Sequence, residues 1–227
     1  MVVGAFAAPA EAGSLVEGLR VAATAGEAME NAEVVIDFSH ASAVVSLAST
    51  CRARALPLVC GTTNVDDHGQ HALEELAKVA PVLWSPNMSL GVQLLAGLVE
   101  QAARTLGVGF DVEVIETHHN KKVDAPSGTA KRLIEAVRAG FDADMPLIHG
   151  REGDVGARKK GEIGVHAIRG GDVVGDHTVM LLGQGERIEL THRASSRDVF
   201  AHGALRAARY LVGRPAGRYT MKDLLGG

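Results

Sequence analysis

The sequence predicts an α/β fold in two parts, a parallel sheet flanked by helices and then an α+β domain built on a second sheet. Two observations predict it. Between residues 33 and 106, short apolar runs alternate with stretches of helical composition, which is the pattern of βαβ units with right-handed crossovers. Between residues 162 and 193, three β-rich runs are joined by glycine-containing turns, which favours a mixed or antiparallel sheet.

The first part contains three expected strands, and each of them ends in a polar turn. We expect strands at Glu33–Phe38, Leu56–Cys60 and Val82–Trp84, with helices at Ala41–Arg52 and Asp67–Val79 between them. Ligands bind beyond the carboxyl ends of parallel strands. The three turns are Phe38-Ser39, Gly61-Thr62-Thr63 and Ser85-Pro86-Asn87-Met88, and together they predict a nucleotide crevice. For any one of them alone, ordinary turn chemistry is the alternative.

The second part begins with a long helix and becomes rich in strands after residue 161. We expect an amphipathic helix at Leu90–Leu106 and assign its core face to Leu90, Leu94, Leu98 and Ala102. Asp111–Glu116 indicates a strand that ends near His118, and Ala130–Val137 indicates a helix with Ser127 as its N-cap. Further strands are expected at Glu162–Ile168, Val173–Leu182 and Arg187–Arg193, with His166, His177 and His192 as sheet residues, and a closing helix at Phe200–Val212.

The composition is that of an ordinary globular chain. With 227 residues and a net charge of −4, it has no general electrostatic footprint for nucleic acid, and we expect no nucleic-acid partner. No apolar run approaches the length of a membrane span and no signal-peptide pattern is present, so we expect no membrane association and a cytoplasmic location. Cys51 and Cys60 lack CxxC spacing, which predicts free thiols in a reducing compartment.

The most informative segment is Glu116–Thr129, which holds two histidines, two lysines and a Pro-Ser-Gly-Thr turn that opens a helix. Cations and the N–H groups of a helix N-terminus attract anions, so the segment predicts a site for a small carboxylate. An ordinary helix cap beside solvated lysines is the alternative. A zinc site at Glu116 and His118 is the rival functional interpretation. We discount it, and predict no metal, because no other His or Cys spacing completes a ligand set.

This segment closely resembles the signature of the dihydrodipicolinate reductase family, nicotinamide-dependent enzymes of the diaminopimelate route to lysine. The resemblance is nearly continuous from Glu33 to the C-terminus. In the order of the family, it also includes Val35–Ser39, Cys60–Thr63, Ser85–Val92, Gly150–Gly153, Gly161–Gly164, Arg169–Gly175 and Thr191–Arg197.

The resemblance implies a doubly wound, Rossmann-like nucleotide domain at 1–88, a substrate-binding and oligomerisation domain at 89–199, and a return of 200–227 to the nucleotide domain. It implies an oxidoreductase that uses NADH or NADPH to reduce 4-hydroxy-tetrahydrodipicolinate (dihydrodipicolinate), a small cyclic dicarboxylate, to tetrahydrodipicolinate. The family is usually a homotetramer built through the β-rich domain, and the resemblance implies the same assembly here.

The resemblance also implies roles for individual residues. His118 would be the principal proton donor, and Lys122 a second donor that also stabilises developing charge. His119 would contact a substrate carboxylate, while Gly128 and Thr129 would hold the distal carboxylate through backbone N–H groups and the Thr hydroxyl. The residues implied to contact the cofactor are Phe38, Gly61, Thr62, Thr63, Ser85, Pro86, Asn87 and Met88.

The N-terminus departs from the family pattern. A dinucleotide-binding half opens with a strand, a glycine-rich turn and a helix, and no GxGxxG or Gly-Arg-Met-Gly occurs in this sequence. We interpret Val2–Phe6 as the family's second strand and Arg20–Ala23 as its third, with Ala7 where an acidic residue would hold the ribose. The nucleotide domain would then lack its first strand and glycine-rich turn, which leaves an unpaired seam in the sheet.

Three explanations of this departure compete: a fragment or mis-started gene model, a truncation that has lost the cofactor, or another chain that fills the seam. The second would make the protein a cofactor-free, dicarboxylate-binding module or an inactive partner subunit. The sequence leaves NADH and NADPH as equal alternatives, because the residues that set the preference belong to the absent segment.

Overall fold

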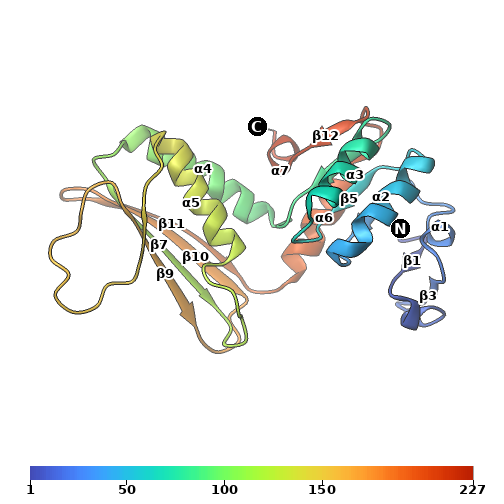
Figure 1. Ribbon diagram of the computed structural model, residues 1–227, viewed down its shortest axis with the longest axis horizontal. Helices are drawn as coiled ribbons and strands as arrows, with labels where there is room; N and C mark the ends of the chain where they lie inside the picture. The colour runs from blue at the N-terminus through green and yellow to red at the C-terminus, as the bar shows by residue number, and fades with distance from the viewer. Residues whose placement is uncertain (227) are drawn as a thin grey trace. The chain divides into compact units, whose positions relative to one another are not determined.

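The computed structural model describes residues 1–226, and their contacts divide the chain into two units (Figure 1). The first unit comprises Met1–Met88 together with the residues from Ala201 onward, and the second comprises Ser89–Phe200. A parallel sheet lies in the first unit and a mixed sheet in the second. The predicted α/β fold class is confirmed.

The first unit contains two sheets. One has four parallel strands in the order β12–β6–β5–β4, and the other has three strands in the order β1–β3–β2. The strands are β1 (Ala5–Phe6), β2 (Leu15–Val16), β3 (Leu19–Ala22), β4 (Val35–Asp37), β5 (Leu58–Cys60), β6 (Pro81–Trp84) and β12 (Gly217–Tyr219). The helices are α1 (Ala25–Ala28), α2 (Val44–Ala53), α3 (Asp67–Ala77), α6 (Asp198–Leu211) and α7 (Met221–Leu224).

The first unit's strands divide into two sheets between the strands that we interpret as the second and the fourth of a doubly wound sheet. Strands β1 and β3 pair in parallel, with Ala5 opposite Val21, as expected of the second and third strands of a doubly wound sheet. In such a sheet the first strand lies between the second and the fourth. Within residues 1–226, β1 and β4 each stand at the end of a sheet, with one edge unpaired.

The second unit is built on one five-stranded sheet in the order β11–β10–β7–β9–β8. Helices α4 and α5 lie on the same face of this sheet (Figure 1). The elements are α4 (Leu90–Leu106), β7 (Asp111–His118), α5 (Gly128–Phe141), β8 (Leu147–His149), β9 (Ile163–Arg169), β10 (Gly175–Leu182) and β11 (Arg187–Ala194). Strand β7 pairs in parallel with β9 and antiparallel with β10, so it lies at the centre of the sheet.

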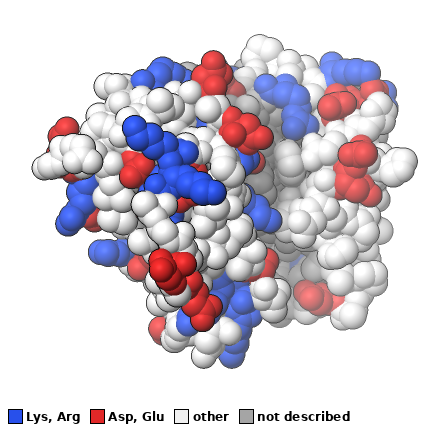
Figure 2. Space-filling model, turned by 60° about the vertical axis from the view of Figure 1, so that its left-hand side comes forward, with Lys and Arg blue, Asp and Glu red and all other residues white. Residues whose placement is uncertain are grey.

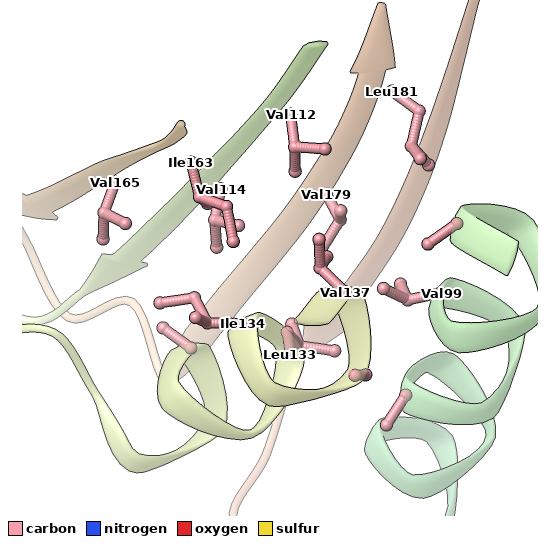
Figure 3. Close-up of a cluster of buried hydrophobic side chains, with 14 of the residues drawn as sticks. Val99, Val112, Val114, Leu133, Ile134, Val137, Ile163, Val165, Val179 and Leu181 are labelled. Atoms are coloured by element: carbon pink, nitrogen blue, oxygen red, sulfur yellow. The ribbon is translucent and has the colours of Figure 1, made fainter. Parts of the chain in front are cut away.

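The core of the second unit lies between this sheet and the two helices (Figure 3). Strand β7 supplies Val112 and Val114, while α5 supplies Leu133 and Val137, all with no exposed surface. Because successive side chains of a strand point to opposite faces, Glu116 lies on the same face as the two valines and is also fully buried. The strand therefore carries its charged residue into the interior.

The buried face of α4 differs from the predicted one. Leu94 and Leu98 are 56% and 43% exposed, so the predicted stripe through these residues is wrong. The residues that enter the core are Val92, Leu95, Ala96, Val99 and Ala103. Both stripes are apolar, so the 3.6-residue period fits either one. Packing against the sheet and α5 decides between them.

Helix boundaries follow local signals only where a cap is strong. Ser127 caps α5 as predicted, since its Oγ accepts the N–H of Ala130 at 3.1 Å, but the helix continues to Phe141. Helix α2 begins at Val44, after a 3-10 turn over Ala41–Ala43, so the predicted start was early. Strands β8 and β12 were not predicted, because each has three residues and depends on pairing with distant strands.

None of the helices in residues 1–226 combines the length and the apolar character needed to cross a membrane. On the face shown in Figure 2, acidic and basic side chains are interspersed.

Candidate active site

Strand β7, helix α5 and the loop between them bring together the segment that the sequence singles out. The strand ends at His118, and the helix begins at Gly128 after a cis peptide bond between Ala125 and Pro126. The carbonyl of His118 accepts the N–H of Gly170 at 2.9 Å, which ties the end of β7 to the turn that follows β9. The predicted substrate segment is therefore held by the neighbouring strand.

Glu116 is the centre of this arrangement. Its Oε2 lies 2.5 Å from Nδ1 of His118, and Arg169 donates to Oε2 and Oε1, both at 2.8 Å. The N–H of Ser127 donates to Oε1 at 3.1 Å. Burial raises the pKa of Glu116, but the hydrogen bonds from Arg169, His118 and Ser127 outweigh it and hold this pKa below its usual value. The carboxylate is therefore ionised and accepts hydrogen bonds through both oxygens.

His177 lies beside His118, with the ring centroids 5.0 Å apart at an interplanar angle of 76°. Its Nε2 is 3.0 Å from Oγ of Ser127, the residue that caps α5. Burial, and then the positive charge that His118 carries when protonated, lowers the pKa of His177 to about 4. His177 is therefore neutral near neutral pH, and it belongs to the site rather than only to the sheet.

The other predicted substrate residues lie around this pair. Nζ of Lys122 donates to Oδ1 of Asp124 at 2.7 Å, and this bond lowers the pKa of Asp124. His119 is half buried. Gly128 is exposed, and a Cβ added there would meet no atom within 4 Å, so the first turn of α5 opens onto free space. The structure thus brings His118, Lys122 and the α5 N-terminus into one region of the second unit.

A second predicted group lies in the first unit, at the carboxyl ends of β4, β5 and β6. These ends are in register, with Asp37 opposite Cys60 and Cys60 opposite Trp84. The buried Asp37 side chain accepts the Ser39 N–H at 3.0 Å and the Thr62 hydroxyl at 2.7 Å. Indole Nε1 of Trp84 donates to the carbonyl of Thr62 at 3.0 Å. The three turns are therefore linked to one another.

The predicted cofactor residues differ in what they can offer a ligand. Phe38, Thr63 and Pro86 are exposed, and Asn87 is half buried. Thr62, Ser85 and Met88 are buried, and the Thr62 hydroxyl is used by Asp37. A Cβ on Gly61 would lie 2.3 Å from the ring of Phe38, so a larger residue there would push this exposed ring aside. An exposed aromatic ring beside polar turns fits a nicotinamide nucleotide.

Four residues organise these two groups in ways that the sequence reasoning did not assign: Asp37, Arg169, His177, and Glu116, which was considered only as a rival zinc ligand. A signal for two of them existed. Glu116 follows Val112 and Val114, and His177 precedes Val179 and Leu181, at the two-residue spacing of a buried strand face. A charged or imidazole side chain at such a position requires a buried partner. No comparable signal identifies Arg169, because its partner is 53 residues away.

Comparison with known proteins identifies one family across nearly the whole chain. Residues 3–88 match the family described as dihydrodipicolinate reductase, N-terminus, and residues 91–225 match dihydrodipicolinate reductase, C-terminus. A 4-hydroxy-tetrahydrodipicolinate reductase of Myxococcus xanthus is 53% identical over 196 residues, which cover 86% of this chain and 72% of the relative. The enzyme of the same name from Thiobacillus denitrificans is 47% identical over 211 residues, 92% of this chain and 79% of the relative.

Solved structures support the fold. The dipicolinate-bound dihydrodipicolinate reductase from Paenisporosarcina sp. TG-14 superposes with a TM-score of 0.73 at 24% identity, covering 91% of this chain and 79% of that one. GenD2 of gentamicin A biosynthesis, solved with NAD, has a TM-score of 0.53 at 14% identity and covers 92% and 77%. With both family halves matched and relatives near half identical, the chain belongs to the dihydrodipicolinate reductase family.

Proposed function

We propose that this protein reduces 4-hydroxy-tetrahydrodipicolinate to tetrahydrodipicolinate with a reduced nicotinamide nucleotide, in the diaminopimelate route to lysine. One observation carries the proposal. Several curated relatives with this activity in their names are 46–53% identical to the chain across 86–92% of its length. The substrate is a cyclic dicarboxylate, and the second unit offers the cations and the helix N-terminus that suit one.

His118 is the proposed proton donor. Loss of water from the 4-hydroxy substrate gives the conjugated dihydrodipicolinate ring. Bound NADH or NADPH would supply a hydride to this ring, and one proton completes the reduction. The imidazole ring of His118 supplies that proton, and its Nδ1 lies 2.5 Å from Oε2 of Glu116. Lys122, held by Asp124, is the proposed second donor and stabilises negative charge that develops on the ring.

The carboxylates of the substrate are assigned to the loop and the helix that follow β7. Gly128 and Thr129 form the first turn of α5, where N–H groups and the helix dipole favour an anion. Open space at Gly128 lets a carboxylate approach the backbone. His119, half buried at the start of the loop, is the proposed contact for the other carboxylate.

The cofactor is assigned to the turns after β4, β5 and β6, with NADH and NADPH both as candidates. Trp84 is the only tryptophan of the chain and it hydrogen-bonds to Thr62 in the central turn, so its fluorescence reports on these turns. We expect saturable quenching when the chain is titrated with NADH or NADPH, with energy transfer to the reduced ring. A folded chain that binds neither nucleotide would contradict this assignment.

The decisive experiment is the substitution His118→Ala. Loss of a positioned general acid lowers turnover by roughly two to four decades, and we expect that loss with the fold preserved. His149→Ala is the matched control, since His149 is an exposed histidine of the same unit and should leave turnover unchanged. Equal turnover for His118→Ala and the unchanged protein would remove His118 as the acid.

A homotetramer is the proposed assembly, formed through the sheet of the second unit. The face of this sheet that α4 and α5 leave uncovered carries Ile115, Met180 and the half-exposed Ile168. Light scattering on the chromatographed protein should give about four times the chain mass of 23.7 kDa. Ile168→Asp, which places a charge on this face, should reduce that mass, and a monomer without the substitution would contradict the assembly.

A further inference from the structure

We propose that Glu116, held by Arg169, is a positioning residue that sets the tautomer and the orientation of the His118 ring. The inference deepens the proposed function, because it rests on His118 as the proton donor. It goes further by assigning the proton on Nδ1 to a buried carboxylate and the transferable proton to Nε2. Four observations carry it.

The first observation is that the Glu116 carboxylate is buried and hydrogen-bonded through both oxygens. Its side chain is fully buried, and three groups donate to it: the guanidinium of Arg169, the ring of His118 and the N–H of Ser127. These donors come from β9, from β7 itself and from the residue that caps α5. Arg169 also donates to the carbonyls of Ile168 and Asp124, at 2.7 and 2.8 Å. The carboxylate is thus fixed relative to the strands and to the loop.

The second observation concerns charge. Glu116 is the only carboxylate hydrogen-bonded to His118 within residues 1–226, and Arg169 binds it with two parallel N–H···O bonds. An ionised carboxylate only accepts hydrogen bonds, so Nδ1 of His118 must carry a hydrogen to face Oε2 at 2.5 Å. In the neutral ring, Nε2 is then the nitrogen without a hydrogen.

The third observation is the space around Nε2. A Cβ placed on Gly175, the first residue of β10, would lie 3.0 Å from Nε2 of His118 and 3.4 Å from Cδ2. A side chain there would push the ring. Glycine at this position therefore leaves room for the Nε2 edge of the imidazole beside the start of β10, while Nδ1 faces Glu116.

The fourth observation is that the neighbours of the ring leave this arrangement undisturbed. His177 packs edge-on against His118 and uses its own Nε2 for the Ser127 hydroxyl. Lys122 is paired with Asp124. The charged and titratable groups near the ring from other segments are therefore Arg169, His177, Lys122 and Asp124, and Glu116 alone among them holds Nδ1.

The test reads the tautomer directly and does not depend on turnover. The intact chain is labelled with ¹⁵N-histidine, and the ring signals of His118 are assigned among the ten histidines by their loss in His118→Gln. At a pH where the ring is neutral, we expect a pyrrole-type shift for Nδ1 and a pyridine-type shift for Nε2. The opposite pattern in the unsubstituted protein would overturn the proposal without any further variant.

Glu116→Gln supplies the second readout. The Oε1 position accepts both the Ser127 N–H and one Arg169 N–H, so the amide oxygen should take that position, which turns the NH₂ group towards His118. We expect the ring to change to the Nε2–H tautomer and kcat to fall by about 10²- to 10⁴-fold with KM nearly unchanged, the loss seen when a histidine is held in the wrong tautomer. Glu116→Asp keeps the charge and should restore the Nδ1–H pattern.

Glu113→Gln is the matched control for the spectra. Glu113 lies on the same strand, accepts hydrogen bonds from Arg151 and Arg158, and faces Nε2 of His166 at 2.8 Å. It points to the opposite face of β7, so its loss should leave the His118 signals unchanged. An equal effect of Glu113→Gln on the His118 tautomer would overturn the proposal.

The outcomes separate this proposal from the reductase assignment. If the tautomer changes in Glu116→Gln but the unsubstituted protein has no reductase activity, the role of Glu116 is supported and the proposed function is overturned. An unchanged tautomer in a folded Glu116→Gln protein would overturn the role of Glu116, whatever the activity. If Glu116→Gln does not fold, the spectra of the unsubstituted protein and of Glu116→Asp still test the proposal. Both must show the Nδ1–H tautomer of His118, and an Nε2–H tautomer in either one would overturn it.

Discussion

Asp37 in the first unit and Glu116 in the second are buried carboxylates near the carboxyl end of a strand, and their hydrogen bonds are satisfied in different ways. Glu116 in the second unit is neutralised by the guanidinium of Arg169 and also contacts a histidine. Asp37 in the first unit receives only neutral donors, from Ser39, Thr62 and Cys60. Burial and then the charge of Asp37 raise the pKa of the Cys60 thiol to about 12. The first arrangement holds the side chain that we propose as the proton donor, and the second links the turns after neighbouring strands.

The two units also differ in how their strands are joined into sheets. The second unit has one sheet of five strands, with a core closed on one face by α4 and α5. In residues 1–226, the first unit has two sheets, and β1 and β4 each leave an edge unpaired. Rigid support for the proposed proton donor therefore coexists with a first unit whose described strands form two separate sheets. We therefore expect substitutions in the second unit to act on the chemical step and those in the first unit to act on cofactor binding.

The largest expected effects come from the two cores. Leu133 in α5 and Leu73 in α3 have no exposed surface, and truncation of either to alanine should cost about 2–5 kcal/mol of unfolding free energy. Trp84 reports only on the first unit. In urea, Leu73→Ala should move the Trp84 fluorescence midpoint, whereas Leu133→Ala should move the circular dichroism transition and leave Trp84 in place.

Leu94→Ala is the control for these core variants, because Leu94 is 56% exposed and its truncation should stay within about 0.5 kcal/mol. If either core variant shifted the Trp84 fluorescence and the circular dichroism transitions together, the two units would unfold as one. The expectation that their stabilities are independent would then be wrong.

The next effect is a pH dependence that belongs to the second unit. The pKa of His177 is lowered to about 4 in the folded protein, below the ordinary 6.5 of the unfolded chain. As the pH falls from 6.5 to 4, the unfolded state therefore takes up a proton that the folded state does not, and stability decreases by about 3 kcal/mol at most. His177→Gln should flatten this part of the stability profile measured by urea unfolding.

His149→Gln, at an exposed histidine, should keep the full slope of the unsubstituted protein. The pKa of His192 is also lowered, first by burial, so some slope of the same sign should persist in His177→Gln. Identical profiles for His177→Gln and His149→Gln would mean that His177 is not the group that titrates.

The smallest expected effect is in the first unit, at the hydroxyl of Thr62. Thr62→Val keeps the volume but leaves Asp37 without its donor at 2.7 Å, which should cost about 1–3 kcal/mol of unfolding free energy. The displaced turn should also weaken the binding of NADH or NADPH, measured through Trp84 fluorescence.

Thr50→Val serves as the control, since the Thr50 hydroxyl donates only to the Ser46 carbonyl of its own helix. If Thr62→Val and Thr50→Val had equal effects on stability and nucleotide binding, Asp37 would have no special role in joining the turns.

Regular elements with clear local signals were predictable. The bounds of α4 agree with the predicted Leu90–Leu106, because Ser89 caps it and Gly107 ends it. Strand β7 ends at His118 as expected. The three strand ends of the nucleotide half are in register, as the βαβ pattern implies. The face of α4 was not predictable, because two apolar stripes satisfied the same period.

The linear order of residues was enough for the family, the α/β class and the histidine-lysine segment, because periodicity, caps and a long motif are local properties. Only the folded chain decided which residues support that segment. Arg169 meets Glu116 across 53 positions, and Ser127 meets His177 across 50. Such pairs arise because β9 and β10 hydrogen-bond to either side of β7. Strand pairing is a long-range event, and local sequence patterns do not encode its partners.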